Sequence, residues 1–194
     1  SDMSILDHAQ YERGVVRQSQ KDYDGAIGDF TQVIARSPKD YEAYFSRGWT
    51  WARKPDYDRA IADFTRCLEI EPGAINAYYQ RGLAKHNKSD YAAAEADYTT
   101  FLGKNPKNAD AYLNRGLVRA ELNNAAGARA DYDKLIEFAP KFARGYKLRG
   151  ALRRDANDLP GALEDAAKAV ELAPGDNDTW WERGYTFLGL KKYD

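Results

Sequence analysis

The stretch "YFSRGWTWARKPDYDRAIADFTRCLEIEP", residues 44–72, carries marks that recur along the chain every 34 residues. Its Arg47-Gly48 dipeptide is one of six Arg-Gly pairs, and no insertion interrupts their spacing. The other five are Arg13-Gly14, Arg81-Gly82, Arg115-Gly116, Arg149-Gly150 and Arg183-Gly184. Self-similarity at such a period indicates a repeat architecture, in which each unit packs only against its neighbours.

Further columns keep a fixed distance from each Arg-Gly glycine. Twelve residues later stands alanine, and twenty-four later proline, in all five complete periods. Four residues earlier stands tyrosine or tryptophan, except for Gln10 in the first period. Sixteen residues later stands a ring in four periods and alanine in the fifth: Phe30, Phe64, Tyr98, Tyr132 and Ala166.

Each column has a structural explanation, and together the columns predict two helices per period. Apolar residues at helical spacing run through both halves, and "KPDYD" at the midpoint (residues 54–58) has turn chemistry with an aspartate to cap the second helix. Proline ends the second helix because it has no N–H to donate. Glycine inside the first helix indicates a close helix crossing, and we expect the alanine twelve residues later to form the opposite wall.

This pattern resembles the tetratricopeptide (TPR) repeat over nearly the whole chain, although the family more often has leucine where this sequence has the arginine. The resemblance implies an all-α, right-handed superhelical solenoid of antiparallel helix hairpins with a concave groove that binds proteins. We expect five full repeats plus one lone first helix. Residues 1–6 would be a tag remnant (Ser1 and Asp2) and lead-in, and 7–194 a single solenoid. The expected repeats are 7–40, 41–74, 75–108, 109–142, 143–176 and the partial 177–194.

An aspartate column suggests why arginine precedes each glycine. Fifteen residues after the glycine stand Asp29, Asp63, Asp97, Asp131 and Asp165. On a helical wheel each aspartate faces the next repeat and each arginine the previous one. We therefore predict pairs between repeats, such as Asp29 with Arg47, which leaves Arg13 without a partner. Such bidentate pairs fix geometry, so the role is structural.

Composition and motifs exclude several classes of function. The 194 residues are 43% hydrophobic and 30% charged, with a net charge of −1, which does not suit nucleic-acid binding. No apolar run is long enough to span a membrane and no signal peptide is visible. Cys67, the single cysteine, falls in a packing column, and the acids at the turns suit helix capping better than calcium. We expect no enzyme activity, metal or cofactor. The cytoplasm is favoured, and the periplasm stays open if a signal was removed.

The TPR resemblance places the lining of the concave groove on the first helices, three residues before and one after each glycine. In the first three repeats this surface is aromatic and apolar, typical of an interaction surface. Packing of the rings along the wall is the alternative. The predicted partner-binding groove consists of Tyr11, Phe45, Trp49, Tyr79 and Leu83.

The fifth repeat is basic. We consider Asn114, Arg144, Lys147 and Arg154 as a patch for an acidic segment or a C-terminal carboxylate, with a solvated basic face as the alternative. The chaperone-tail clamp of some TPR proteins matches only at Asn114 and Arg144, so tail binding of that type is not predicted.

The sequence stops where a sixth second helix would begin, which would leave Trp180 and Phe187 uncovered. Truncation of a longer protein is favoured, and self-association through these rings, as a weak homodimer, is the alternative to a monomer. The leading prediction is a non-catalytic scaffold that binds an extended peptide or helix of a partner protein. The alternatives are a self-assembling structural module and the regulatory domain of a larger, possibly enzymatic, protein.

Overall fold

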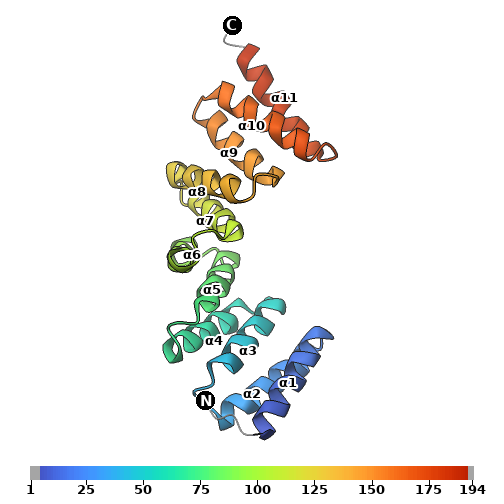
Figure 1. Ribbon diagram of the computed structural model, residues 1–194, viewed down its shortest axis with the longest axis vertical. Coiled ribbons are helices and arrows are strands. Elements are labelled where there is room, and N and C mark those ends of the chain that lie inside the picture. The colour runs from blue at the N-terminus through green and yellow to red at the C-terminus, as the bar shows by residue number, and fades with distance from the viewer. Residues whose placement is uncertain (1–4, 192–194) are drawn as a thin grey trace. The chain divides into compact units, whose positions relative to one another are not determined.

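The structure of the chain, a computed structural model, describes residues 5–191, apart from the side chains at 178–179, 181–182 and 190–191. The described residues form helices without strands (Figure 1). The predicted remnant, Ser1 and Asp2, lies outside them. The helices are α1 (Ile5–Ser19), α2 (Tyr23–Arg36), α3 (Tyr41–Arg53), α4 (Tyr57–Ile70), α5 (Ile75–Asn87), α6 (Tyr91–Lys104), α7 (Ala109–Glu121), α8 (Ala125–Phe138), α9 (Ala143–Asp155), α10 (Leu159–Leu172) and α11 (Asn177–Lys191).

Odd-numbered helices are the first helices of the expected hairpins and even-numbered helices are the second ones. The turn between them is capped as the sequence predicts. Asp56 accepts a hydrogen bond from the backbone N–H of Arg59 at 3.1 Å. Asp22 and Asn124 cap α2 and α8 in the same way. Capping by a side-chain oxygen satisfies a backbone donor that the first turn of a helix leaves open. The first acid of each pair, Asp22 or Asp56, is therefore a helix cap, and the second, Asp24 or Asp58, forms an ion pair with a lysine.

Hydrogen bonds join the proline and aromatic columns at three places. The hydroxyl of Tyr112 donates to the carbonyl of Pro106 at 3.1 Å, and Tyr146 does the same to Pro140. The indole Nε1 of Trp180 donates to a proline carbonyl at 3.0 Å. In these three repeats the ring four residues before the glycine thus fixes the entry into the first helix. Gln10, the exception, uses its amide to bond other polar side chains of the first hairpin.

The Arg-Gly glycine lies where the two helices of a hairpin touch. A Cβ on Gly116 would come within 2.5 Å of the Tyr132 ring, and one on Gly82 within 2.9 Å of Tyr98. A Cβ on Gly48 would also meet the carbonyl oxygen of Ala60 at 3.2 Å. The close crossing is confirmed. At Gly82 and Gly116 the nearest atoms belong to the ring, which was expected to flank the alanine.

The chain divides into two compact units, one ending at Lys104 and the other beginning at Asn105. The first holds the hairpins α1–α2, α3–α4 and α5–α6, and the second holds α7–α8, α9–α10 and α11. The all-α hairpin fold class is thus confirmed. A single solenoid over 7–194 stays a prediction. Within 5–191, no helix is both long and apolar enough to cross a membrane.

Candidate functional site

The arginine ladder, defined as the Arg-Gly arginines with their aspartates, is formed inside each repeat. Arg47 donates from Nε to Asp63 Oδ2 at 2.8 Å and from Nη2 to Oδ1 at 2.7 Å. Equivalent bidentate pairs are Arg13–Asp29, Arg81–Asp97, Arg115–Asp131 and Arg149–Asp165. All five aspartates are at most 5% exposed.

The predicted pairing between repeats is therefore wrong, and so is the expectation that Arg13 lacks a partner. The two helices of a hairpin run antiparallel, which places residues 16 apart opposite each other at the same height. A helical wheel gives the direction of a side chain around its helix axis. It does not show which residue of a neighbouring helix lies at the same level along that axis. The hydrogen bond from Arg13 holds the pKa of Asp29 below its usual value, against the effect of burial.

A weaker link between repeats does run through the same guanidinium groups. The remaining nitrogen of Arg47, Nη1, donates to Thr31 Oγ1 of the preceding repeat at 3.1 Å. Arg81 reaches Thr65 in the same way, and Arg149 reaches the carboxylate of Asp133 at 2.7 Å. Each acceptor stands 16 residues before its arginine. The ladder therefore also links each of these hairpins to the preceding one.

A second cation shares most of these aspartates, which the sequence analysis missed. It stands four residues after the ladder arginine, one turn along the same helix face. Arg17 Nη1 lies 2.9 Å from Asp29, and Lys85 Nζ lies 2.8 Å from Asp97. The second repeat has Trp51 at this position. The recurring cations of the other four repeats were the signal that could have revealed the site: Arg17, Lys85, Arg119 and Arg153.

The three predicted groove rings located three residues before the glycine pack on their own repeats. Tyr11 lies with its ring centroid 5.5 Å from that of Phe30, and its hydroxyl hydrogen-bonds Ser46 Oγ at 2.8 Å. The ring of Phe45 contacts Phe64, and that of Tyr79 contacts Tyr98 and Phe101. All three groove rings are half-buried. They form the wall of the first unit and support the packing alternative.

The other two predicted groove residues share a cleft. Trp49 on α3 and Leu83 on α5, both half-buried, line a cleft of about 330 Å³ in the first unit. The sequence analysis did not select its remaining lining residues: Ala52, Arg53, Tyr57, Gln80, Ala84 and Asn87. Arg53 and Asn87 both stand five residues after an Arg-Gly glycine, a column that could have revealed them.

A cation lies directly on the apolar wall of this cleft. The guanidinium carbon of Arg53 is 4.4 Å from the centroid of the Trp49 ring, within the range of a cation–π contact. Arg53 has no carboxylate partner among the residues that the structure describes. The cleft therefore combines an indole face and an aliphatic side chain with an unneutralised positive charge, and Gln80 and Asn87 add amide groups.

The residues of the predicted acidic-ligand patch are distributed over α7 and α9 in the second unit. Arg154 lies against Asp155 at 3.3 Å, and Asn114 and Lys147 also have interactions within the protein. Only Arg144 is exposed and has no ion pair with any side chain that the structure describes. The patch stays a prediction.

The two rings predicted for self-association lie on α11. Trp180 is 48% exposed and Phe187 is 49% exposed, and both line a groove of about 760 Å³ against α10. This apolar groove is larger than the cleft beside Trp49.

Cysteine and possible metal ligands are the remaining candidates for chemistry. Cys67 is fully buried, as its packing column predicts, and burial raises the pKa of its thiol to about 11. Among the described side chains, no group of three or more His, Cys, Asp or Glu is placed to hold a metal ion.

Geometry and comparison together define the class of protein. Helical hairpins in series, with a glycine at each crossing and a proline after each second helix, define an α-helical repeat protein. The tetratricopeptide repeat family model matches residues 11–75 and 79–141, more than half of the chain. The chain belongs to the tetratricopeptide repeat family. No curated protein matches the sequence.

Solved structures share the fold. A structure of MamA aligns with a TM-score of 0.84 and 24% identity over 89% of this chain and 94% of that one. A MamA fragment from Desulfovibrio magneticus RS-1 gives 0.85 and 19% over 90% and 98%. YrrB, described as a TPR protein with an unusual peptide-binding site, gives 0.82 and 16% over 90% of each chain. At these identities the likeness concerns the fold, and that fold supports a role as a protein-interaction scaffold.

Proposed function

We propose that this chain is a non-catalytic scaffold that binds a peptide segment of a partner protein on the groove face of its first unit. The binding site is the cleft beside Trp49 and Leu83, and the peptide carries an apolar side chain next to a carboxylate. The observation that carries the proposal is Arg53, which lies 4.4 Å over the Trp49 ring and has no carboxylate partner within the described chain.

The chemistry of the cleft suits this ligand in two respects. Trp49 and Leu83 offer apolar surface, and aromatic side chains are frequent anchors of protein interfaces. A carboxylate of the ligand would form a charge-assisted hydrogen bond with Arg53, which is stronger than one between neutral groups. The amides of Gln80 and Asn87 can bond the peptide backbone, and an extended segment has unpaired backbone groups to offer.

Selection from a library of displayed peptides tests this proposal without knowledge of the natural partner. The affinity of a selected peptide is then measured for wild type, Trp49→Ala and Trp51→Ala. Trp51 is the matched control because it is half-buried on the same helix but packs under Arg59 and does not line the cleft. We expect Trp49→Ala to weaken binding at least about tenfold, a loss typical of an interface anchor, and Trp51→Ala to leave it within about twofold.

Equal weakening by both tryptophan variants would place the peptide elsewhere and contradict the proposal. Circular dichroism of each variant gives the helical content, so that loss of binding is not confused with loss of structure. Self-association through α11 and a regulatory role in a larger protein stay predictions. Light scattering at high protein concentration tests self-association, and a strict monomer would contradict it.

A further inference from the structure

A polar side chain closes the space between the first helices of the first two repeats. Gln18 on α1 donates from Nε2 to the carbonyl oxygen of Ser46 at 3.2 Å and to Thr50 Oγ1 at 2.6 Å, and both acceptors are on α3. Thr50 is fully buried, and its hydroxyl donates to the same carbonyl of Ser46 at 2.7 Å. The amide of Gln18 therefore fills the place between α1 and α3, and α3 supplies its hydrogen-bond partners.

The equivalent place between α3 and α5 has two alanines instead. One 34-residue period after Gln18 stands Ala52, and one period after Thr50 stands Ala84. Both alanines line the cleft of the proposed binding site, where Ala84 is buried and Ala52 is half-buried. A methyl group neither reaches across to the next helix nor forms a hydrogen bond. The space that Gln18 fills in the first repeat is therefore part of the cleft of about 330 Å³ here.

The second unit has leucines at the equivalent place. The residues in the same columns on α7 and α9 are Ala120, Leu148 and Leu152. All three pack against the hydrophobic cluster that contains Tyr132 and Leu135. The alanine of the earlier helix is thus kept, and the later helix supplies leucine side chains beside it. Apolar side chains of this size are therefore compatible with the place between two first helices.

The three places together indicate what the open one accepts. It lacks the hydroxyl that Gln18 bonds in the first repeat, because Ala84 stands in the column of Thr50, so a buried amide would lose that hydrogen bond. Trp49 and Leu83 add apolar surface. Apolar cavities of roughly 150 Å³ hold a benzene molecule. The cleft, at about 330 Å³, therefore has room for a leucine, methionine or phenylalanine side chain.

We propose that Ala52 and Ala84 determine the specificity of this cleft, and that the partner peptide inserts between α3 and α5 an apolar side chain at least as large as leucine. This anchor fills the place that Gln18 fills between α1 and α3. The carboxylate beside it in the peptide pairs with Arg53, which directly follows Ala52 in the sequence. The inference rests on the proposed function, because it names the anchor residue of the peptide that the cleft binds.

The first test concerns the peptide. A peptide selected from the displayed library is labelled, and its binding to the intact chain is measured by fluorescence anisotropy. Alanine replacement at each peptide position identifies the anchor. We expect a leucine, methionine or aromatic anchor whose replacement by alanine weakens binding at least about tenfold, because a single methylene in an apolar pocket contributes that much. A polar anchor, or one no larger than valine, would overturn the proposal.

The second test fills the cleft from inside the protein. Position 52 is half-buried and glutamine is a good helix former, so Ala52→Gln should fold normally. We expect this variant to bind the peptide at least about tenfold more weakly than wild type. Replacement of the anchor by alanine should then cost no more than about a further twofold, because the anchor no longer enters the cleft. Ala52→Gln/Ala84→Thr reproduces the residue pair of the first repeat and should give the same result.

Ala62→Gln is the matched control for the added glutamine. Ala62 belongs to the same hairpin as Ala52, but it is exposed on α4 and does not line the cleft. This variant should bind the peptide within about twofold of wild type. Circular dichroism and urea denaturation of each variant distinguish a filled cleft from a loss of structure.

The inference and the proposed function fail in different ways. Weaker binding by Trp49→Ala together with unchanged binding by Ala52→Gln would overturn the inference and leave the proposed function intact. Equal weakening by Trp49→Ala and Trp51→Ala would overturn both. A homodimer of wild type that Ala52→Gln converts to a monomer would also overturn the inference, because a second copy of the chain would then fill the cleft.

Discussion

The guanidinium of Arg47 holds the carboxylate of Asp63 with two hydrogen bonds, of 2.8 and 2.7 Å, across the two helices of one hairpin. Asp63 is buried, and within the described residues no second cation shares it, since Trp51 stands where other repeats have lysine or arginine. This pair is therefore the simplest member of the arginine ladder. It joins α3 to α4, and Arg47 also extends to Thr31 on α2.

A double-mutant cycle should find strong coupling between Arg47 and Asp63. Arg47→Gln or Asp63→Asn alone should lower the free energy of unfolding by about 1–3 kcal/mol, because each leaves a buried partner unsatisfied. The double variant should lose much less than the sum. Urea denaturation measures all four proteins.

The cycle of Arg47 with Asp29 is the control for the arrangement between repeats. Asp29 is held by Arg13 and Arg17, so its cycle with Arg47 should be nearly additive. Strong coupling in that second cycle would contradict the pairing inside each repeat.

Alanine at two glycines of the same column should have opposite effects. Gly116→Ala should destabilise the protein by about 1–3 kcal/mol, since its Cβ would come within 2.5 Å of the buried Tyr132 ring. Gly184→Ala should stabilise by up to about 1 kcal/mol, because space is open and alanine favours the helix. The denaturation midpoints of the two variants measure both effects. A loss of stability in Gly184→Ala would show that the face of α11 is occupied.

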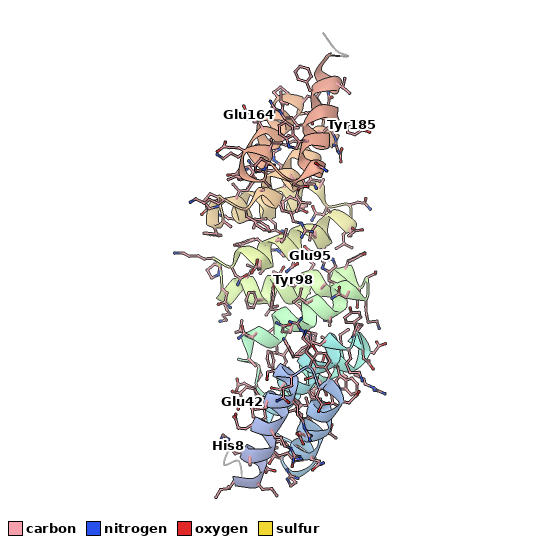
Figure 2. The ribbon with its side chains drawn as sticks, turned by 90° about the vertical axis from the view of Figure 1, so that its right-hand side faces the viewer. His8, Glu42, Glu95, Tyr98, Glu164 and Tyr185 are labelled. Carbon is pink, nitrogen blue, oxygen red and sulfur yellow. The ribbon has the colours of Figure 1, made fainter. Side chains whose placement is uncertain are left out.

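Tyr98→Phe should stabilise the first unit. Tyr98, labelled in Figure 2, is fully buried and its hydroxyl has no hydrogen-bond partner. Phe30 and Phe64 fill the equivalent positions without a hydroxyl. Removal of an unsatisfied buried hydroxyl should raise the free energy of unfolding by about 1 kcal/mol. A lower free energy of unfolding for the variant would indicate that the hydroxyl is bonded in solution.

Cys67 should react slowly with a disulfide reagent near neutral pH. Burial raises its pKa to about 11, whereas an exposed cysteine titrates near 8.5. At pH 8 the thiolate fraction is then about 0.1%, against roughly a quarter for a free thiol. We expect the reaction to accelerate in urea, as the helix unfolds. Modification of the folded protein at the rate of a small thiol would contradict this burial.

Much of the fold could be predicted from the sequence because the same residue columns recur in each 34-residue period, and every period indicates the same pair of helices. Its turns, caps, prolines and glycine crossings are local or recur in every repeat. The ladder was assigned to the wrong neighbour because the height of two helices relative to each other depends on the loop between them. Among the groove residues, the sequence places Tyr11, Phe45 and Tyr79 in one column and Trp49 and Leu83 in another. That the first column contacts second-helix rings, whereas the second lines a cleft, depends on packing, which the sequence does not give.

The most direct test of the binding site is photo-cross-linking of the selected peptide from two exposed positions. Benzoylphenylalanine replaces Asn87, at the edge of the cleft, or Arg66 on α4, which does not line the cleft. Both positions are exposed, so neither replacement should disturb the core. Our account predicts a covalent adduct from position 87 and little or none from position 66. Equal adducts from both positions, or an adduct from position 66 alone, would contradict it.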